Sequence, residues 1–136
     1  MIRLDGVTKQ YPDGTVAVDD LSLTAPDRAI TVLVGPSGCG KTTTLRMINR
    51  MIEPTSGSVT IDGQDVLAMD AAQLRRGIGY VIQHGGLFPH HTVERNVAAV
   101  PRLLGTAKKT AISRARELLE LVGLDPALGR RYPSQL

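Results

Sequence analysis

Residues 30–52 read ITVLVGPSGCGKTTTLRMINRMI, and the period of the apolar residues changes within this stretch. Residues 30–34 are almost continuously aliphatic, which is typical of a strand buried on both faces. From residue 41 the apolar positions recur at helical spacing, and the pair Glu53-Pro54 predicts the end of that helix. A glycine-rich turn separates the two, so the stretch predicts a strand, a tight loop and a helix in an α/β fold.

The turn between strand and helix reads GPSGCGKT and matches the phosphate-binding loop pattern G-x-x-x-x-G-K-[ST]. In such a loop the glycines let backbone N–H groups point inward, and the helix N-terminus adds positive potential. Lys41 is expected to reach the outer phosphates of a nucleotide, and the Thr42 hydroxyl is expected to ligate Mg²⁺. The predicted nucleotide-binding residues of the loop are Gly35, Pro36, Ser37, Gly38, Cys39, Gly40, Lys41 and Thr42.

Two residues in and beside this motif leave alternatives open. Thr43 follows the motif, and we expect it to donate a hydrogen bond to a phosphate oxygen; simple capping of the helix N-terminus is the alternative. Cys39 lies at the start of the helix, where a thiol can be activated. The interpretation we prefer for Cys39 is a small side chain that fills a tight loop.

Strands and turns surround the loop on both sides. Residues 2–11 and 16–25 predict strands joined by the turn Pro12-Asp13-Gly14. Residues 58–63 predict a short strand that ends in an Asp-Gly turn, and residues 78–82 predict a second buried aliphatic strand.

Helices dominate the second half of the chain. Asp70 is expected to cap a brief helix, and residues 92–104 are helical in pattern, although Pro101 should kink or end that helix. Residues 108–122 predict the clearest helix, with Gly123 as its C-cap. Its predicted inner face comprises Ile112, Ala115, Leu119 and Val122.

The composition is that of an ordinary globular domain, with 136 residues, 42% of them hydrophobic and 21% charged. A net charge of +3 from scattered basic residues argues against a nucleic-acid partner. The single cysteine excludes an internal disulfide and a Cys-rich metal site. Residues 29–34 are far shorter than the roughly 18 apolar residues of a membrane helix, and Asp5 interrupts any signal-peptide core, so neither a membrane span nor export is expected.

Four motifs in order make the chain resemble the ATP-binding subunits of ABC transporters along its whole length. They are Tyr11 before the turn at 12–14, the phosphate loop, the segment SGSVTIDG at 56–63, and GYVIQ at 79–83, which looks like the family's Q-loop. Residues 83–93, QHGGLFPHHTV, are most similar to importer ATPases for glycine betaine, choline and related osmoprotectants. The segment TTLRMIN at 43–49 also fits that branch.

The resemblance implies an incomplete ABC cassette: a P-loop NTPase core with an antiparallel β-subdomain and the beginning of a helical subdomain. Residues 1–34 and 56–68 would belong mainly to the β-subdomain, and residues 29–53 and 78–83 to the core. Residues 84–136 would contain the Q-loop and part of the helical subdomain.

The family also assigns roles to residues outside the phosphate loop. Tyr11 would stack on the adenine of ATP, with packing beside the hairpin turn as the alternative. Gln83 would approach Mg²⁺ and the attacking water, so the resemblance implies Thr42 and Gln83 as metal-binding residues. Asp62 superficially resembles a metal-binding aspartate at a strand end, but the family match places it in the antiparallel subdomain.

No complete catalytic set is expected within these residues. The last four residues, Pro-Ser-Gln-Leu, look like the approach to the signature motif, with Leu136 at its first position. The family's Walker B aspartate, catalytic glutamate and switch histidine would therefore lie beyond Leu136. Three histidines fall in the Q-loop region, so none is expected to be the switch histidine; they are His84, His90 and His91.

The resemblance implies an ATP-hydrolysing subunit of an importer, cytoplasmic and peripheral on the inner face of the membrane. Its partners would be a transmembrane permease contacted through residues 84–104, a second ATP-binding subunit in a dimer, and indirectly a solute-binding protein. Residues 1–136 alone are expected to be inactive. If they are a complete protein, a non-hydrolysing nucleotide-binding module is the better description. A soluble ABC-family ATPase of translation or repair is a third reading; a GTPase fits worse, because no Asn-Lys-x-Asp motif occurs.

Overall fold

A computed structural model describes residues 1–83 and 85–136, which divide into two compact units, Met1–Gly79 and Tyr80–Leu136. The first unit contains a four-stranded antiparallel sheet in the order β2-β1-β3-β4. Its strands are β1 (Ile2–Gln10), β2 (Val16–Ala25), β3 (Ser56–Ile61) and β4 (Gln64–Asp65). The antiparallel sheet expected around the phosphate loop is therefore confirmed.

Two hairpins build this sheet, and both had been indicated by turn residues. Residues 11–15 join β1 to β2 as the Pro-Asp-Gly sequence predicts. Asp62 and Gly63 join β3 to β4 with φ angles of 51° and 79°, which is the left-handed pair that a type I′ turn needs. The Asp62 N–H donates to the Met1 carbonyl at 2.8 Å, and its carboxylate pairs with the N-terminal ammonium of Met1, so Asp62 lies in the antiparallel subdomain as the resemblance implied.

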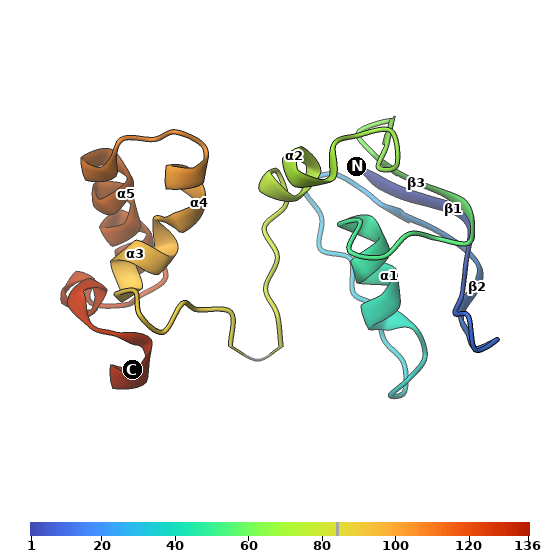
Figure 1. Ribbon diagram of the computed structural model, residues 1–136, viewed down its shortest axis with the longest axis horizontal. Coiled ribbons are helices and arrows are strands. Elements are labelled where there is room, and N and C mark those ends of the chain that lie inside the picture. Colours follow the sequence, from blue (N-terminus) through green and yellow to red (C-terminus); the bar gives the residue numbers. More distant parts are fainter. Residues whose placement is uncertain (84) are drawn as a thin grey trace. The chain divides into compact units, whose positions relative to one another are not determined.

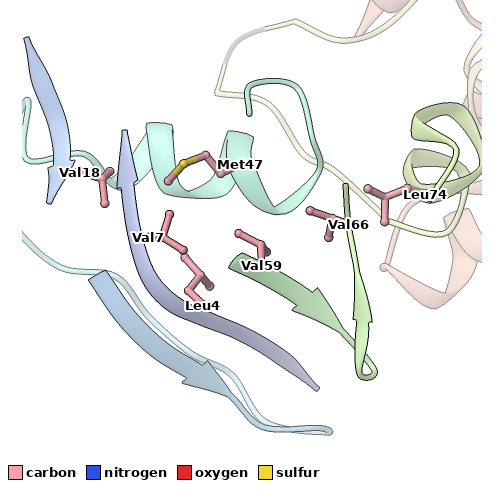
Figure 2. Close-up of a cluster of buried hydrophobic side chains, with 7 residues drawn as sticks. All are labelled: Leu4, Val7, Val18, Met47, Val59, Val66 and Leu74. Atoms are coloured by element: carbon pink, nitrogen blue, oxygen red, sulfur yellow. The ribbon is translucent and has the colours of Figure 1, made fainter. Parts of the chain in front are cut away.

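Helix α1 (Lys41–Ile48) packs its apolar side against the sheet and closes the first core. Figure 2 shows Met47 of this helix pointing toward Leu4, Val7 and Val59 of the strands. Met47, Val7 and Val59 are fully buried, and each such side chain contributes roughly 1.5–3 kcal/mol to folding. The packing fixes the position of the helix N-terminus, where the phosphate loop ends. Val18, Val66 and Leu74 complete the cluster.

Helix α1 ends at Ile48, five residues before the predicted stop at Glu53. Arg50 adopts a left-handed conformation with φ 51°, and the N–H groups of Arg50 and Met51 return to the carbonyls of Met47 and Arg46. This is a Schellman ending with a residue other than glycine at the left-handed position. The Arg50 guanidinium donates to the Met69 carbonyl at 2.6 Å and pairs with Glu53, which helps hold that conformation.

Two predicted strands do not form. Residues 30–34 and 78–82 lie outside every strand, and neither is paired with another strand in the described part of the chain. The aliphatic side chains expected to be buried on both faces are instead open, with Ile30 at 93%, Val34 at 89% and Val81 at 95% exposure. A parallel strand needs hydrogen-bonding neighbours, and these segments have none within residues 1–83 and 85–136.

Helices make up the second unit (Figure 1). They are α3 (Val93–Val97), α4 (Ala99–Leu103), α5 (Lys108–Leu121), and the short 3₁₀ helices η1 (Pro126–Arg130) and η2 (Pro133–Gln135). The predicted helix at 92–104 is broken at Ala98, three residues before Pro101, because proline cannot donate to the preceding turn. No helix in residues 1–83 or 85–136 combines the length and apolarity that crossing a bilayer requires.

Small side chains form the core of this helical unit. Ala98, Ala111 and Ala115 are buried, with Val97 and Ile112 packed against them. Helix α5 ends at Leu121, one residue before the predicted end, and its C-cap is Val122 rather than Gly123. Gly123 follows in a left-handed conformation with φ 78°, and its N–H donates to the Glu120 carbonyl. The predicted inner face is wrong at one position: Val122 is 68% exposed, because it is the C-cap residue where the helix has already ended.

The remaining helix of the first unit, α2 (Ala71–Arg76), begins where the sequence predicts. The Asp70 carboxylate accepts a hydrogen bond from the Gln73 N–H at 2.9 Å, and Leu74 is buried.

Candidate functional site

The phosphate loop is folded around the ammonium group of Lys41. Nζ of Lys41 donates to the Gly35 carbonyl at 2.8 Å and to the Pro36 carbonyl at 2.7 Å, and it lies 3.3 Å from Sγ of Cys39. These three contacts come from residues two to six positions earlier in the chain, so the loop curls back over its own lysine. A positive charge is thereby held inside the curve of the backbone.

Two glycines allow this curvature. Gly38 and Gly40 have φ angles of 84° and 88°, which non-glycine residues rarely adopt. At Gly40 a side chain is also excluded by space, because a Cβ there would lie 2.3 Å from the carbonyl oxygen of Ala17 in β2. The end of the loop is therefore seated directly against the first hairpin.

The first turn of α1 offers its backbone N–H groups to an anion. Gly40 is the N-cap and supplies no side-chain hydrogen bond, and the first turn contains no acidic residue. Thr44 is buried and its hydroxyl donates to the Gly40 carbonyl at 3.0 Å, whereas Thr42 is exposed and Thr43 is half-buried. The threonine that could ligate a cation is thus the one facing outward.

Tyr11 begins the turn that joins β1 to β2. Its N–H donates to the Thr15 carbonyl and its own carbonyl accepts from the Gly14 N–H, both at 2.9 Å. Nζ of Lys9 lies 5.5 Å from the centre of the ring, within cation–π range. Hydrogen bonds from the Thr15 backbone and side chain hold the pKa of Asp13 below its usual value, so this turn keeps its negative charge. Tyr11 is half-buried.

Gln83 lies exposed in the second unit, so its approach to Thr42 stays a prediction. His84 lies outside the described residues. His90 is exposed, whereas His91 is half-buried and its Nδ1 atom is buried with no hydrogen-bond partner in residues 1–83 and 85–136. Leu87 and Phe88 are 49% and 50% exposed, so this segment presents apolar side chains at its surface.

Asn96 was missed by the sequence reasoning, although it organises the segment after Gln83. Its side chain accepts from the Phe88 N–H at 2.7 Å and donates to the carbonyls of Phe88, His91 and Thr92 at 3.1–3.2 Å. A single amide therefore fixes residues 88–92 on helix α3. The one signal available was a polar residue on the inner side of an otherwise apolar helical pattern.

Comparison with known proteins matches these features to one family. A family model described as "ABC transporter" matches residues 18–136. The chain is 48% identical to the glycine betaine/carnitine/choline transport ATP-binding protein OpuCA of Bacillus subtilis (strain 168), and 49% identical to the osmoprotectant import ATP-binding protein OsmV of Salmonella typhimurium (strain LT2). All of this chain is covered in both cases, but only 36% and 37% of the relatives' lengths.

Solved structures of the cassette MJ0796 have the same fold. One is a dimeric structure of a post-hydrolysis state bound to ADP and Pi, with a TM-score of 0.86 and 30% sequence identity. The other is a dimeric structure of this bacterial ABC transporter cassette, with a TM-score of 0.87 and 32% identity. Both alignments cover 100% of this chain and 63% of the solved chain. The ABC cassette fold expected from the motifs is confirmed.

Proposed function

The chain belongs to the ABC transporter family, and we propose that it serves as the ATP-binding subunit of an importer that couples ATP binding and hydrolysis to uptake of a small solute. The observation that carries this proposal is the loop at residues 35–41, which encloses the Lys41 ammonium at the start of α1. The chain spans a little over a third of the length of the curated relatives it matches. Activity, substrate and partners of the whole protein are therefore part of the proposal.

ATP and Mg²⁺ fit the residues of the loop. The Lys41 ammonium and the uncapped N–H groups of α1 are donors without acceptor capacity, which suits phosphate oxygens. Binding would exchange the Gly35 and Pro36 carbonyls for phosphate oxygens as partners of Lys41, since both carbonyls now accept from it. The exposed Thr42 hydroxyl is an oxygen ligand of the kind that Mg²⁺ prefers.

In this proposal each residue of the candidate site has a defined task. Lys41 and the loop backbone hold the β- and γ-phosphates and offset charge that develops during phosphoryl transfer. The Tyr11 ring stacks on adenine, and Thr43 donates to a phosphate oxygen. Mg²⁺, when bound through Thr42 and Gln83, supplies charge neutralisation between the phosphates. The Gln83 amide orients the attacking water.

The substrate and partners are inferred from the relatives. OpuCA and OsmV are described as acting on glycine betaine, carnitine, choline or osmoprotectants, so we assign this chain a quaternary-amine solute. Its partners would be a permease that contacts residues 84–104, a second ATP-binding subunit, and indirectly a solute-binding protein. The chain would lie in the cytoplasm against the inner face of the membrane.

We also propose a division of the chain into three parts of an ABC cassette. Residues 1–34 and 56–68 form mainly the β-subdomain, residues 29–53 and 78–83 the phosphate-loop core, and residues 84–136 the Q-loop with part of the helical subdomain.

The test is equilibrium titration of the chain with a fluorescent ATP analogue. Lys41→Ala should weaken binding about tenfold or more, because a charge-assisted contact to phosphate is lost. Tyr11→Ala should lose on the order of 1 to 3 kcal/mol, and Tyr11→Phe little, because stacking uses the ring and not the hydroxyl. Unchanged affinity in folded Lys41→Ala would rule out the loop as the nucleotide site.

A phosphate-release assay on the whole subunit assembled with its permease separates the two functional readings, because residues 1–136 alone are expected to be inactive. Turnover that Lys41→Ala abolishes supports an ATPase. Tight binding without turnover in the assembled transporter would favour the non-hydrolysing nucleotide-binding module.

A further inference from the structure

Two adjoining grooves run along the helices of the second unit, with volumes of about 490 and 510 Å³. They share Arg95, Lys108 and Ile112 as lining residues. Figure 1 shows α3, α4 and α5 side by side in this unit, and each helix contributes one cation to the first groove: Arg95, Arg102 and Lys108. No carboxylate lines this groove among the residues that the structure describes.

The surrounding segment concentrates the positive charge of the chain. Residues 91–116 contain six Lys and Arg side chains and one Glu, a surplus of five, whereas the whole chain carries +3. Glu94 is already neutralised, because Arg116 contacts its Oε2 atom at 2.9 Å. Arg114 pairs with Glu117 at 2.8 Å. By contrast, none of the ion pairs within residues 1–83 and 85–136 involves Arg95, Arg102 or Lys108.

Arg95, Arg102 and Lys108 repel one another around the empty groove, because they carry the same charge. A multiply charged anion bound there would offset this repulsion. One further feature adds to the attraction, because Lys108 is the first residue of α5, whose N-terminus has no side-chain cap.

The lining also includes an apolar part. Ala98, Ala99 and Ile112 contribute hydrocarbon surface to the first groove. The volume of this groove falls within the range of small-molecule sites, where an apolar surface takes the body of a ligand and a few polar groups orient it.

We propose that this groove binds the phosphate group of a small soluble organic phosphate, with the cations holding the phosphate and the apolar lining holding the organic part. Phosphate suits the donor set because the planar guanidinium groups of Arg95 and Arg102 match its oxygens in pairs. None of these residues belongs to the phosphate loop, so the site is separate from the proposed nucleotide site. Part of its lining falls within residues 84–104, the segment proposed to contact the permease, so the proposal concerns the subunit apart from the permease.

The test is calorimetric titration of the whole chain with phenyl phosphate, with Lys41→Ala as the background so that the phosphate loop contributes little. Arg102→Gln should weaken binding about tenfold, because one charge-assisted contact is lost. The matched control is Arg114→Gln, which removes the same charge from the same unit outside both grooves and should change affinity by less than about twofold. Inorganic phosphate should bind more weakly than phenyl phosphate, because it leaves the apolar lining empty.

A second arm distinguishes the source of the phosphate group. The same variants are sedimented with phosphatidylglycerol vesicles and with phosphatidylcholine vesicles. Retention of phenyl phosphate affinity in Arg102→Gln, or an equal loss in Arg114→Gln, would overturn the proposal. So would vesicle binding that depends on Arg102 without any binding of phenyl phosphate, because the ligand would then be a lipid headgroup. Lys108→Gln should reproduce Arg102→Gln, and circular dichroism confirms that each variant is folded.

Discussion

Gly40 carries two constraints at once, because its φ is 88° and its missing side chain makes room for the Ala17 carbonyl. Gly40→Ala should therefore lower the free energy of unfolding by at least about 2 kcal/mol, from left-handed backbone strain and from a Cβ placed 2.3 Å from a backbone oxygen. The loop would have to move off β2, so nucleotide affinity should fall as well. Urea unfolding and ATP titration measure the two effects.

Gly14→Ala is the matched control for this substitution. Gly14 has a φ of 86°, but apart from its two chain neighbours no residue would lie within 4 Å of an added Cβ, so only the backbone strain remains, at about 1 kcal/mol. Equal destabilisation by the two substitutions would show that the contact with Ala17 does not restrict the loop.

Single residues were predictable from the sequence where their role depends on near neighbours in the chain. The phosphate loop follows from eight consecutive residues, and the contacts of Lys41 all lie within that run. Asn96 and Arg50 could not be predicted, because their partners include Phe88 eight positions away and Met69 nineteen positions away. Their hydrogen bonds exist only once the chain has folded.

Among the elements, helix α2 depends on its cap, because its six residues are too few to be stable by propensity alone. Asp70→Ala removes the acceptor of the Gln73 N–H and should cost about 1 kcal/mol of stability. Asp70→Asn keeps a side-chain oxygen and should cost much less. Urea denaturation of both variants provides the measurement, and similar losses for the two would contradict the capping role.

Turns and helix ends that depend on residues close in the sequence were predicted correctly. The two aliphatic strands, which depend on hydrogen-bonding partners from other parts of the chain, were not. The two hairpins, the start of α2 and the left-handed turn at Gly123 after α5 follow from turn and capping residues. The aliphatic runs at 30–34 and 78–82 have the composition of buried strands, but strand formation requires hydrogen-bonding neighbours that composition cannot supply. The early end of α1 reflects the contacts of Arg50 rather than local propensity.

At the scale of the whole molecule, each of these aliphatic segments leaves apolar side chains open. Ile30, Val32, Val34 and Val81 are 93%, 70%, 89% and 95% exposed. Segments whose backbone N–H and C=O groups are not paired with another strand can pair with a second chain. Residues 1–136 should therefore self-associate as the protein concentration rises. Sedimentation velocity should show the sedimentation coefficient increasing over the micromolar range.

Val32→Lys should reduce this association, because a charge on the segment opposes strand pairing. The control is Leu121→Lys, which places the same charge on a 77% exposed apolar residue of α5. A concentration-independent monomer, or an equal effect of both substitutions, would show that residues 30–34 are not the contact surface.

Residues 35–42 should receive the phosphates of ATP. Amide ¹H–¹⁵N spectra recorded with increasing Mg²⁺-ATP test it directly, because the backbone N–H groups of the loop are the predicted donors. The largest shifts should fall on the amides of Gly38, Cys39, Gly40 and Lys41, and they should disappear in Lys41→Ala. Shifts confined to other residues, or loop shifts that persist in folded Lys41→Ala, would contradict the account.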